Sequence, residues 1–314
     1  MTAASGLHPP HLEYRENSLL VYRILVYTVA SRHCRGHADF GESVMTNYPK
    51  YYSGKELYGD DFTPEQIRVW FEEEESGYYQ LATASQENPQ ENYPYHGLNE
   101  THGYRFLRSR TFRQCLGLGV GGGHDVRPIA AQVERFYCIE PGKAWWRDEL
   151  FGKPATFAMP QPDGTIELGD SSCDLAVSLG VLHHIPNVTA VLTELSRVLM
   201  SSGLLVLREP IVTMGEWGKP RGGLTKNERG LPLSWLRERM HSLGFETVNE
   251  QLCAFQPFIV GMARLLNKKV YSSVPLTRVD ALLSDLTAFN ARYYRPTFLG
   301  KFAPAAIFGV YRKR

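Results

Sequence analysis

The stretch that decides the fold is Arg113-Gln-Cys-Leu-Gly-Leu-Gly-Val-Gly-Gly-Gly-His-Asp125. Its first part, residues 113–118, is mostly apolar and predicts a buried strand. Five of the seven residues from 117 to 123 are glycine, and a helix to about Glu134 is expected after them. Glycine lets the backbone turn tightly and lets a ligand approach main-chain N–H groups at a helix start. The stretch therefore predicts a strand, a ligand-binding turn and a helix.

Strands and helices go on alternating after this stretch. Further strands are predicted at 136–140, 155–159, 174–179, 204–208, 245–255 and 305–311. The clearest helix covers 188–199, with Asn187 as its cap and Ser201-Ser-Gly203 as its end, and another covers 232–243. This order is typical of an open, mostly parallel α/β sheet, which we expect to occupy residues 111–314.

The first 110 residues do not share this pattern. Residues 1–44 form an uncertain leader, and Met45 is a candidate start, because Gly41-Glu42 would be encoded by a purine-rich tract like a bacterial ribosome-binding site. Residues 45–110 hold nine of the 17 tyrosines and predict a helical cap. Its clear helix begins with a Thr63–Gln66 capping box, and we expect Glu72–Glu75 to be solvated and Gly77 to end it.

An insertion, residues 256–304, separates the last two predicted strands. It contains a helical pattern at 279–289 and an aromatic cluster that includes Phe289 and Tyr293. Segments of this length inside a compact domain usually have their own structure and a function. A substrate cap and an interface element both remain open as interpretations.

Composition excludes several classes of function. The 314 residues carry 34 Lys and Arg against 33 Asp and Glu, interleaved along the chain, for a net charge of +1. Nucleic-acid binding depends on clustered basic residues, so no nucleic-acid partner is expected. The apolar run 19–30 contains Arg23 and is shorter than the roughly 20 residues that a spanning helix needs. With no signal-peptide pattern either, we expect a cytoplasmic protein without a membrane span.

The five cysteines show no metal-binding spacing. Four of them, Cys115, Cys138, Cys173 and Cys253, lie in strand-like runs, and we predict buried thiols and no metal site. Nothing in the sequence indicates an oligomeric state.

A carboxylate in the right place adds to the meaning of the glycine turn. Glu140 ends the second predicted strand, where a carboxylate can accept hydrogen bonds from both hydroxyls of a ribose. The two features together predict a cofactor that contains adenosine. The glycine spacing fits two such cofactors, because Gly117-x-Gly119-x-x-Gly122 suits a dinucleotide and Gly119-x-Gly121-x-Gly123 suits S-adenosylmethionine (SAM).

The downstream sequence resembles the class I SAM-dependent methyltransferases, in particular their small-molecule, type 11-like group. The resemblance lies in Asp170-Ser-Ser-Cys-Asp-Leu-Ala-Val-Ser-Leu-Gly-Val-Leu-His-His-Ile-Pro186 and in the run Leu195–Glu209. It extends over about 113–255 and the final strand. It implies a doubly wound, Rossmann-like sheet of seven strands and SAM as cofactor.

The resemblance also implies roles for individual residues. Gly119, Gly121 and Gly123 would line the methionine and ribose side, and Glu140 would hold the ribose hydroxyls. The backbone at Leu179 and Gly180 would hold the methionine end, and Asp163 is the candidate for the adenine edge, although Pro162-Asp-Gly164 reads equally well as a plain turn.

One position departs from the family. The cofactor-side acid that usually ends the first strand is replaced by Gly117. The amino group of SAM must then be held from elsewhere, or affinity is lower, or the protein no longer catalyses.

Methyl transfer mainly requires that donor and acceptor be brought together. An alcohol or ammonium acceptor must also lose a proton, which makes a nearby base useful. His183 and His184 follow the fourth strand of the core and Glu209 ends the fifth, at the sheet edge where open α/β folds bind ligands. These three residues are the catalytic candidates, and packing or capping roles are their alternatives.

Weaker candidates lie in neighbouring segments. Tyr95 and His96 belong to the cap, and Arg221, Lys226 or Arg229 in the 213–230 loop could meet an anionic group of the acceptor. A merely solvated loop is the alternative.

Together these features predict an enzyme, a SAM-dependent methyltransferase that acts on a hydroxyl, amine or carboxyl of a small molecule, with sugars and secondary metabolites among the candidates. An oxidoreductase that uses a nicotinamide dinucleotide (NAD) is the alternative suggested by the glycine spacing. A non-catalytic SAM-binding protein is the alternative suggested by Gly117.

Overall fold

The computed structural model describes residues 48–83, 93–217, 219, 221 and 223–314, with the backbone alone for 75–83. The predictions for residues 1–44, which include the leader and Cys34, lie outside the described residues, as does the candidate start at Met45.

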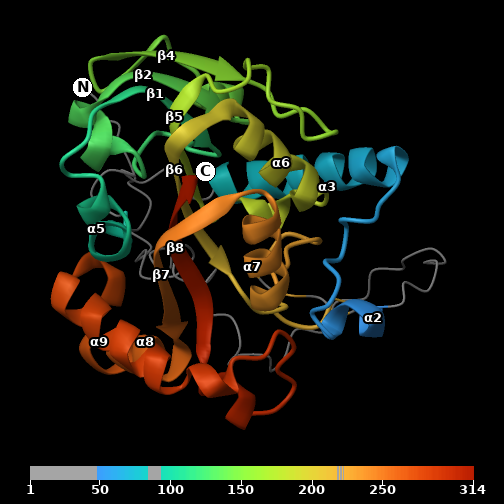
Figure 1. The fold of residues 1–314 in the computed structure, drawn as a ribbon. Helices are drawn as coiled ribbons and strands as arrows, with labels where there is room; N and C mark the ends of the chain where they lie inside the picture. The colour runs from blue at the N-terminus through green and yellow to red at the C-terminus, as the bar shows by residue number, and fades with distance from the viewer. Residues whose placement is uncertain (1–47, 84–92, 218, 220, 222) are drawn as a thin grey trace, which may run out of the picture.

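The centre of the molecule is one sheet (Figure 1). Its strands are β1 (Phe112–Leu118), β2 (Val133–Ile139), β3 (Glu149–Leu150), β4 (Lys153–Ala158), β5 (Cys173–Leu179), β6 (Leu199–Pro210), β7 (Phe245–Phe255) and β8 (Pro304–Lys313). They lie in the order β3-β4-β2-β1-β5-β6-β8-β7. The strands from β4 to β6 are parallel, and β8 runs antiparallel to both of its neighbours. The predicted α/β class is confirmed, and the short β3 adds an eighth strand to the seven expected.

Helices cover both faces of the sheet (Figure 1). The α-helices are α2 (Tyr48–Tyr52), α3 (Pro64–Thr83), α5 (His96–His102), α6 (Val188–Val198), α7 (Leu233–Ser242), α8 (Gln256–Leu266) and α9 (Val274–Leu286). Short 3₁₀ helices include η3 (Arg127–Gln132) and η5 (Leu182–His184). Helices α6 and α7 share one apolar core with the sheet, whereas α5 and α8 contribute to a second core on the other face.

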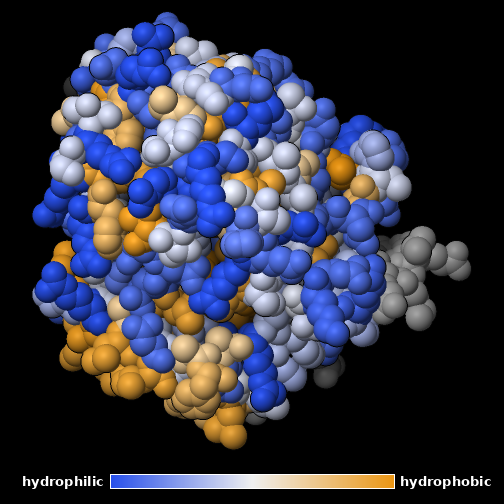
Figure 2. Space-filling model, in the orientation of Figure 1, coloured by the Kyte–Doolittle hydropathy of each residue, from blue (hydrophilic) through white to orange (hydrophobic). Residues whose placement is uncertain are grey.

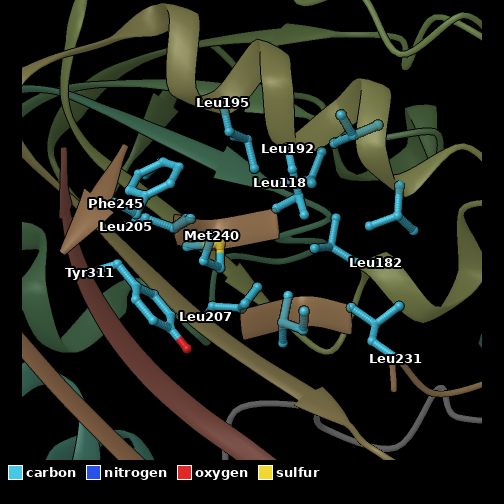
Figure 3. Packing of buried hydrophobic residues seen from close by; sticks show 14 of the residues in the cluster. Leu118, Leu182, Leu192, Leu195, Leu205, Leu207, Leu231, Met240, Phe245 and Tyr311 are labelled. Carbon is cyan, nitrogen blue, oxygen red and sulfur yellow. The ribbon is translucent and has the colours of Figure 1, made fainter. Parts of the chain in front are cut away.

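The first core forms because α6 repeats apolar residues at helical spacing. Leu192 and Leu195 point from α6 toward Leu205 and Leu207 of β6, with Met240 of α7 beside them (Figure 3). All five side chains are buried. Burial of each large apolar side chain contributes on the order of 1.5–3 kcal/mol, so this contact fixes α6 and therefore the loop that precedes it.

The helix expected after the glycine turn does not form. Residues 119–126 make tight turns, and only η3 precedes β2. Pro128 lacks a backbone N–H and is tolerated only in the first turn of a helix, and β2 begins five residues later, at Val133. Val126 and Ile129 are buried instead as part of the second core.

Three predicted boundaries are also wrong. Helix α3 continues through Gly77 to Thr83, because one glycine inside a helix costs only about 1 kcal/mol. Helix α6 ends at Val198 and β6 starts at Leu199, ahead of Ser201-Ser-Gly203. The helix predicted at 279–289 is α9, which starts earlier because Pro275 lies in its first turn.

Two smaller predictions are confirmed, the capping box of α3 and the buried cysteines. Gln66 accepts a hydrogen bond from the Thr63 N–H, and Thr63 accepts one from the Gln66 N–H, which completes the capping box. Cys115, Cys138, Cys173 and Cys253 are buried free thiols. Among the described residues, no helix has the length and apolar character needed to cross a membrane.

The first core provides a stability test. Leu195→Ala should lower the free energy of unfolding by about 2–5 kcal/mol, because it leaves a cavity between α6 and the sheet. Urea unfolding measures this, with Thr193→Ala on the exposed side of the same helix as the control. Equal effects of the two substitutions would contradict the placement of the core.

Candidate active site

The candidate site lies where the chain reverses direction across the sheet. From β1 the sheet extends one way to β2 and from the adjacent β5 the other way to β6, and ligands of open α/β folds bind at such a point. The glycine loop follows β1, and the turn η5 follows β5. The two meet closely, since a Cβ on Gly119 would stand 2.7 Å from a methyl group of Val181.

The glycine loop needs its glycines for backbone geometry. Gly119, Gly121 and Gly123 have positive φ angles of 61°, 49° and 84°. Residues with a side chain rarely adopt such angles. A Cβ built on Gly121 would have no other atom within 4 Å. The backbone of Gly121 is therefore open to close approach by a ligand, and its role in cofactor binding stays a prediction.

Packing explains why glycine occupies position 117 in place of the family's acidic residue. A Cβ at this position would stand 2.5 Å from a methyl group of Val120. The space that an acidic side chain would need at the end of β1 is filled by Val120, which folds back over the strand and is buried. The conformation of the loop therefore leaves no room at position 117 for the acidic side chain that the family usually has.

Glu140 stands at the end of β2 with its side chain buried. One carboxylate oxygen accepts the Gly121 N–H and the other the Gly142 N–H, each at 2.8 Å. Burial raises the pKa of Glu140, while these two N–H groups act in the opposite direction. Each oxygen keeps a lone pair, so the carboxylate can still accept hydrogen bonds from two ligand hydroxyls.

Arg208, which the sequence analysis missed, lies beside the predicted methionine end. Its guanidinium donates to the Leu179 carbonyl at 3.0 Å and to Asn99 Oδ1 at 2.9 Å, and it lies 4.1 Å from the centre of the Tyr95 ring. A cation therefore already bonds the Leu179 carbonyl predicted to bind the cofactor's amino group. The signal in the sequence was an arginine at the end of an otherwise apolar strand.

The same network includes the last residue of the glycine stretch. Asp125 is partly buried, and it accepts hydrogen bonds from Tyr93 and Asn99, and from Tyr104 through its backbone carbonyl. Burial raises the pKa of Asp125 to about 6, and the charge of Arg208 limits the rise. These contacts tie α5 and the cap to the glycine loop.

Asp163 lies on the loop after β4 and is exposed. Its carboxylate accepts the Thr165 N–H at 2.9 Å, the contact that defines a simple turn. Its role at the adenine edge stays a prediction.

His183 and Glu209 come together as a buried pair. His183 Nδ1 lies 2.8 Å from Glu209 Oε2, and both residues are at most 2% exposed. Glu209 also accepts the backbone N–H groups of Val181, Leu182 and His183, at 2.9, 2.8 and 3.3 Å. The other ring nitrogen, His183 Nε2, is buried and has no hydrogen-bond partner among the described residues.

His184 points the other way, to the cap. Its Nδ1 lies 2.9 Å from Glu74 Oε2 and 3.7 Å from Glu228 Oε1. Burial lowers the pKa of His184, but the hydrogen bond that it donates to Glu74 and the charges of Glu228 and Glu209 outweigh this effect, so the net pKa is raised. The prediction that Glu74 is solvated is wrong, since it also accepts a hydrogen bond from Thr225 at 2.7 Å.

The basic residues of the 213–230 loop have partners within the protein. Arg229 is completely buried, and its guanidinium donates to backbone carbonyls of the cap and of the turn after β5. These are the carbonyls of Tyr58, Leu182, His183, Ile185 and Pro186. Arg221 donates to carbonyls of its own loop, and Lys226 pairs with Glu73. The anion-binding prediction is therefore wrong for Arg229, which has a structural role.

The weaker candidates of the cap also pack against the protein. The Tyr95 ring covers Arg208, and the His96 ring contacts that of Tyr93 edge-on at 4.8 Å between centroids. Burial lowers the pKa of His96.

A cavity of about 340 Å³ lies between α2, α3 and the 213–230 loop. Aromatic rings of Tyr58, Phe62, Trp70 and Trp217 contribute to its wall. Trp70 also donates from Nε1 to the His184 carbonyl at 2.7 Å, so one side chain is shared by the cavity and the turn that carries the two histidines.

The residues that build this edge match a known family. The family described as "Methyltransferase domain" matches residues 116–207, from inside β1 to inside β6. The match includes the glycine loop, Glu140 and the turn with His183 and His184. The chain therefore carries a methyltransferase domain over these residues, and the enzyme is a SAM-dependent methyltransferase. SAM is accordingly its cofactor, and the oxidoreductase alternative left open by the glycine spacing is set aside.

Solved structures similar to this methyltransferase include two bacterial enzymes. The 1,6-didemethyltoxoflavin-N1-methyltransferase of Burkholderia thailandensis has 15% identity and a TM-score of 0.45, over 80% of this chain and 91% of that one. A SAM-dependent methyltransferase of Mesorhizobium loti has 16% identity and a TM-score of 0.44, over 67% and 97%. No curated protein matches in sequence.

The ribose end of the methyltransferase site fits SAM. Glu140 offers two acceptor oxygens, and the backbone at Gly121 is open beside them. At the methionine end Arg208 supplies a positive charge, and the Leu179 carbonyl keeps one lone pair for a further donor.

Glu140 allows a direct test of cofactor binding. Glu140→Gln should weaken binding of S-adenosylhomocysteine by about 1.5–3 kcal/mol, the usual contribution of hydrogen bonds to a charged group. Calorimetric titration measures it, and Glu134→Gln, an exposed position on the same strand, is the control. Unchanged affinity in a folded Glu140→Gln variant would remove Glu140 from the site.

The His184–Glu74 contact predicts a pH dependence of stability. Because the pKa of His184 is raised, its contribution is complete below the ordinary histidine value and is lost as the pH rises through the folded-state pKa. The lowered pKa of Glu74 keeps that carboxylate charged in this range. The coupling free energy of a His184→Asn and Glu74→Gln double-mutant cycle should therefore shrink as the pH rises above the ordinary histidine value of about 6.5. Urea unfolding at several pH values checks this, and a constant coupling would contradict it.

Proposed function

We propose that this methyltransferase acts on a hydroxyl or amine of a small molecule, with His183 as the general base that takes the acceptor's proton. The single observation behind the proposal is the buried His183–Glu209 pair with its unpartnered Nε2. A carboxyl acceptor, the third option from the sequence, needs no base and gives this pair no role.

The contacts support one assignment of the protons within the pair. A carboxylate that accepts three backbone N–H groups is an acceptor and not a donor, so the hydrogen between it and the imidazole belongs on His183 Nδ1. The lone pair then lies on Nε2. Glu209 thus acts as the positioning residue that fixes the tautomer and the ring orientation of the base.

The two histidines divide their tasks. His184, with its raised pKa and its carboxylate partners, is suited to hold a proton and to dock the cap. His183 lies on the side of Gly180, since a Cβ at that glycine would be 3.8 Å from the His183 ring. Its ring therefore borders the cofactor side of the turn.

The cavity beside Trp70 is the candidate place for part of a small acceptor, because Trp70 joins it to the turn that carries the histidines, although His183 does not line it. Its volume of about 340 Å³ is at the lower end of the range for small-molecule sites. Aromatic walls with Gln66 and Asn227 at hand suit a ring-shaped molecule that carries polar groups. SAM supplies the methyl group, and the residues of the chain bind, orient and deprotonate the acceptor.

The proposal is tested by turnover of the full chain. S-adenosylhomocysteine formation is measured with panels of small alcohols, amines and carboxylic acids, for the wild type and for His183→Asn. Loss of a general base should lower turnover of an alcohol or amine by about 10²- to 10⁴-fold while S-adenosylhomocysteine binding stays unchanged.

His241→Asn, an exposed histidine on α7, is the matched control. Turnover that is restricted to carboxylic acids, or that survives His183→Asn in a variant that still binds S-adenosylhomocysteine, would overturn the role of His183.

A further inference from the structure

The insertion before the last strand exposes an unusual amount of apolar side chain. Nine of the twelve large hydrophobic residues exposed in the described structure belong to it, with Phe289 at 89% and Leu265 at 83%. They are Leu265, Leu266, Val279, Leu282, Leu286, Phe289, Phe298, Leu299 and Phe302. We refer to the surface formed by these nine side chains as the α8–α9 face. Figure 2 shows apolar surface gathered over α8, α9 and the segment that follows.

Helix α9 is turned with its apolar residues outward. It buries the polar Thr277, Asp280 and Ser284, whereas Leu282 and Leu286 are 59% and 64% exposed. Asp280 faces inward because its carboxylate accepts hydrogen bonds from the Ala254 and Phe255 N–H groups, at 2.9 Å each. Among the described residues these leucines remain largely uncovered, and a gathered apolar surface of this kind marks an interaction site.

Charge accompanies this apolar surface. Residues 256–304 contain seven lysines and arginines but only two acids, Asp280 and Asp285, in a chain that is otherwise balanced at 34 basic and 33 acidic residues. Asp280 is buried. Four of the basic residues, Arg264, Lys268, Arg278 and Arg292, are exposed. In the part of the chain that the structure describes, these four form no ion pair.

We propose that the α8–α9 face binds the surface of an anionic lipid membrane. Leucine and phenylalanine side chains enter the headgroup boundary, and the surrounding lysine and arginine side chains meet lipid phosphates, as in amphipathic helices that lie on membranes. Arg264 and Lys268 flank Leu265 and Leu266, and Arg278 lies one turn from Leu282. The inference does not depend on which acceptor is methylated.

Charge favours lipid over a second copy of the chain as the occupant. In a symmetric dimer the same patch occurs on both sides of the interface. Two faces with this excess of basic residues would then be placed opposite each other, which is unfavourable. An anionic lipid surface satisfies both the apolar and the basic residues.

Co-sedimentation with vesicles tests the proposal on the full chain. The protein should bind vesicles of phosphatidylcholine mixed with phosphatidylglycerol and bind pure phosphatidylcholine much more weakly, and added salt should reduce binding. Lys268→Gln with Arg278→Gln should weaken binding to the mixed vesicles about tenfold or more, since each basic residue near an anionic surface contributes severalfold. Leu282→Gln with Leu286→Gln should weaken binding to a similar extent.

The control removes the same charge elsewhere. Lys55→Gln with Arg135→Gln changes two exposed basic residues outside the insertion and should leave vesicle binding unchanged. Circular dichroism checks that each variant is folded.

Two outcomes would overturn the proposal. One is binding that is insensitive to phosphatidylglycerol or absent in the folded wild type. The other is a dimer in sedimentation velocity that Leu282→Gln with Leu286→Gln dissociates, which would assign the face to a second copy.

Discussion

The turn after β5 depends on the buried guanidinium of Arg229. Five backbone carbonyls accept its hydrogen bonds, four from the turn and one from Tyr58 of the cap. Its environment holds the Trp70 ring at 5.3 Å but no carboxylate at hydrogen-bond distance among the described residues. Burial lowers the pKa of Arg229, yet arginine keeps its charge over any ordinary pH. A lysine could not satisfy this number of carbonyls from one position, so the cap, the 213–230 loop and the sheet are joined at a point only arginine can fill.

Glu209 does for the N–H groups of this turn what Arg229 does for its carbonyls. The carboxylate accepts three consecutive N–H groups and also holds the His183 ring. Backbone groups of the turn, residues 181–186, thereby find hydrogen-bond partners in two buried side chains of opposite charge. The Glu209 carboxylate and the Arg229 guanidinium do not bond each other. Each is hydrogen-bonded to peptide groups of the turn that lies between them. Because these hydrogen bonds hold both the backbone of the turn and the His183 ring, the side chain of His183 has one fixed orientation.

The sequence predicted what local pattern determines. Alternating apolar runs gave the strands of the parallel sheet, and spacing placed the glycines, Glu140 and the paired histidines at its edge. It did not predict what long-range packing determines. Glu74 looked solvated within an acidic run, and only the approach of His184, 110 residues away, buries it. Arg208 received no predicted role, and Arg229 was expected to meet an anion or to be solvated, because their carbonyl partners come from segments that sequence spacing does not connect. The absence of a helix after the glycine loop lies between these two cases, because Pro128 in the sequence already argued against a long helix there.

The 3₁₀ turn in place of that helix changes how the site can recruit its ligand. A full helix that starts at the glycine loop would add its aligned peptide dipoles and project a positive potential beyond its end. Here the N–H groups of Gly121 and Gly142 are directed at Glu140. The 3₁₀ turn therefore adds less of this potential than a full α-helix would. Recognition at this edge depends correspondingly more on short-range contacts, such as those that Glu140 and the Gly121 backbone can make.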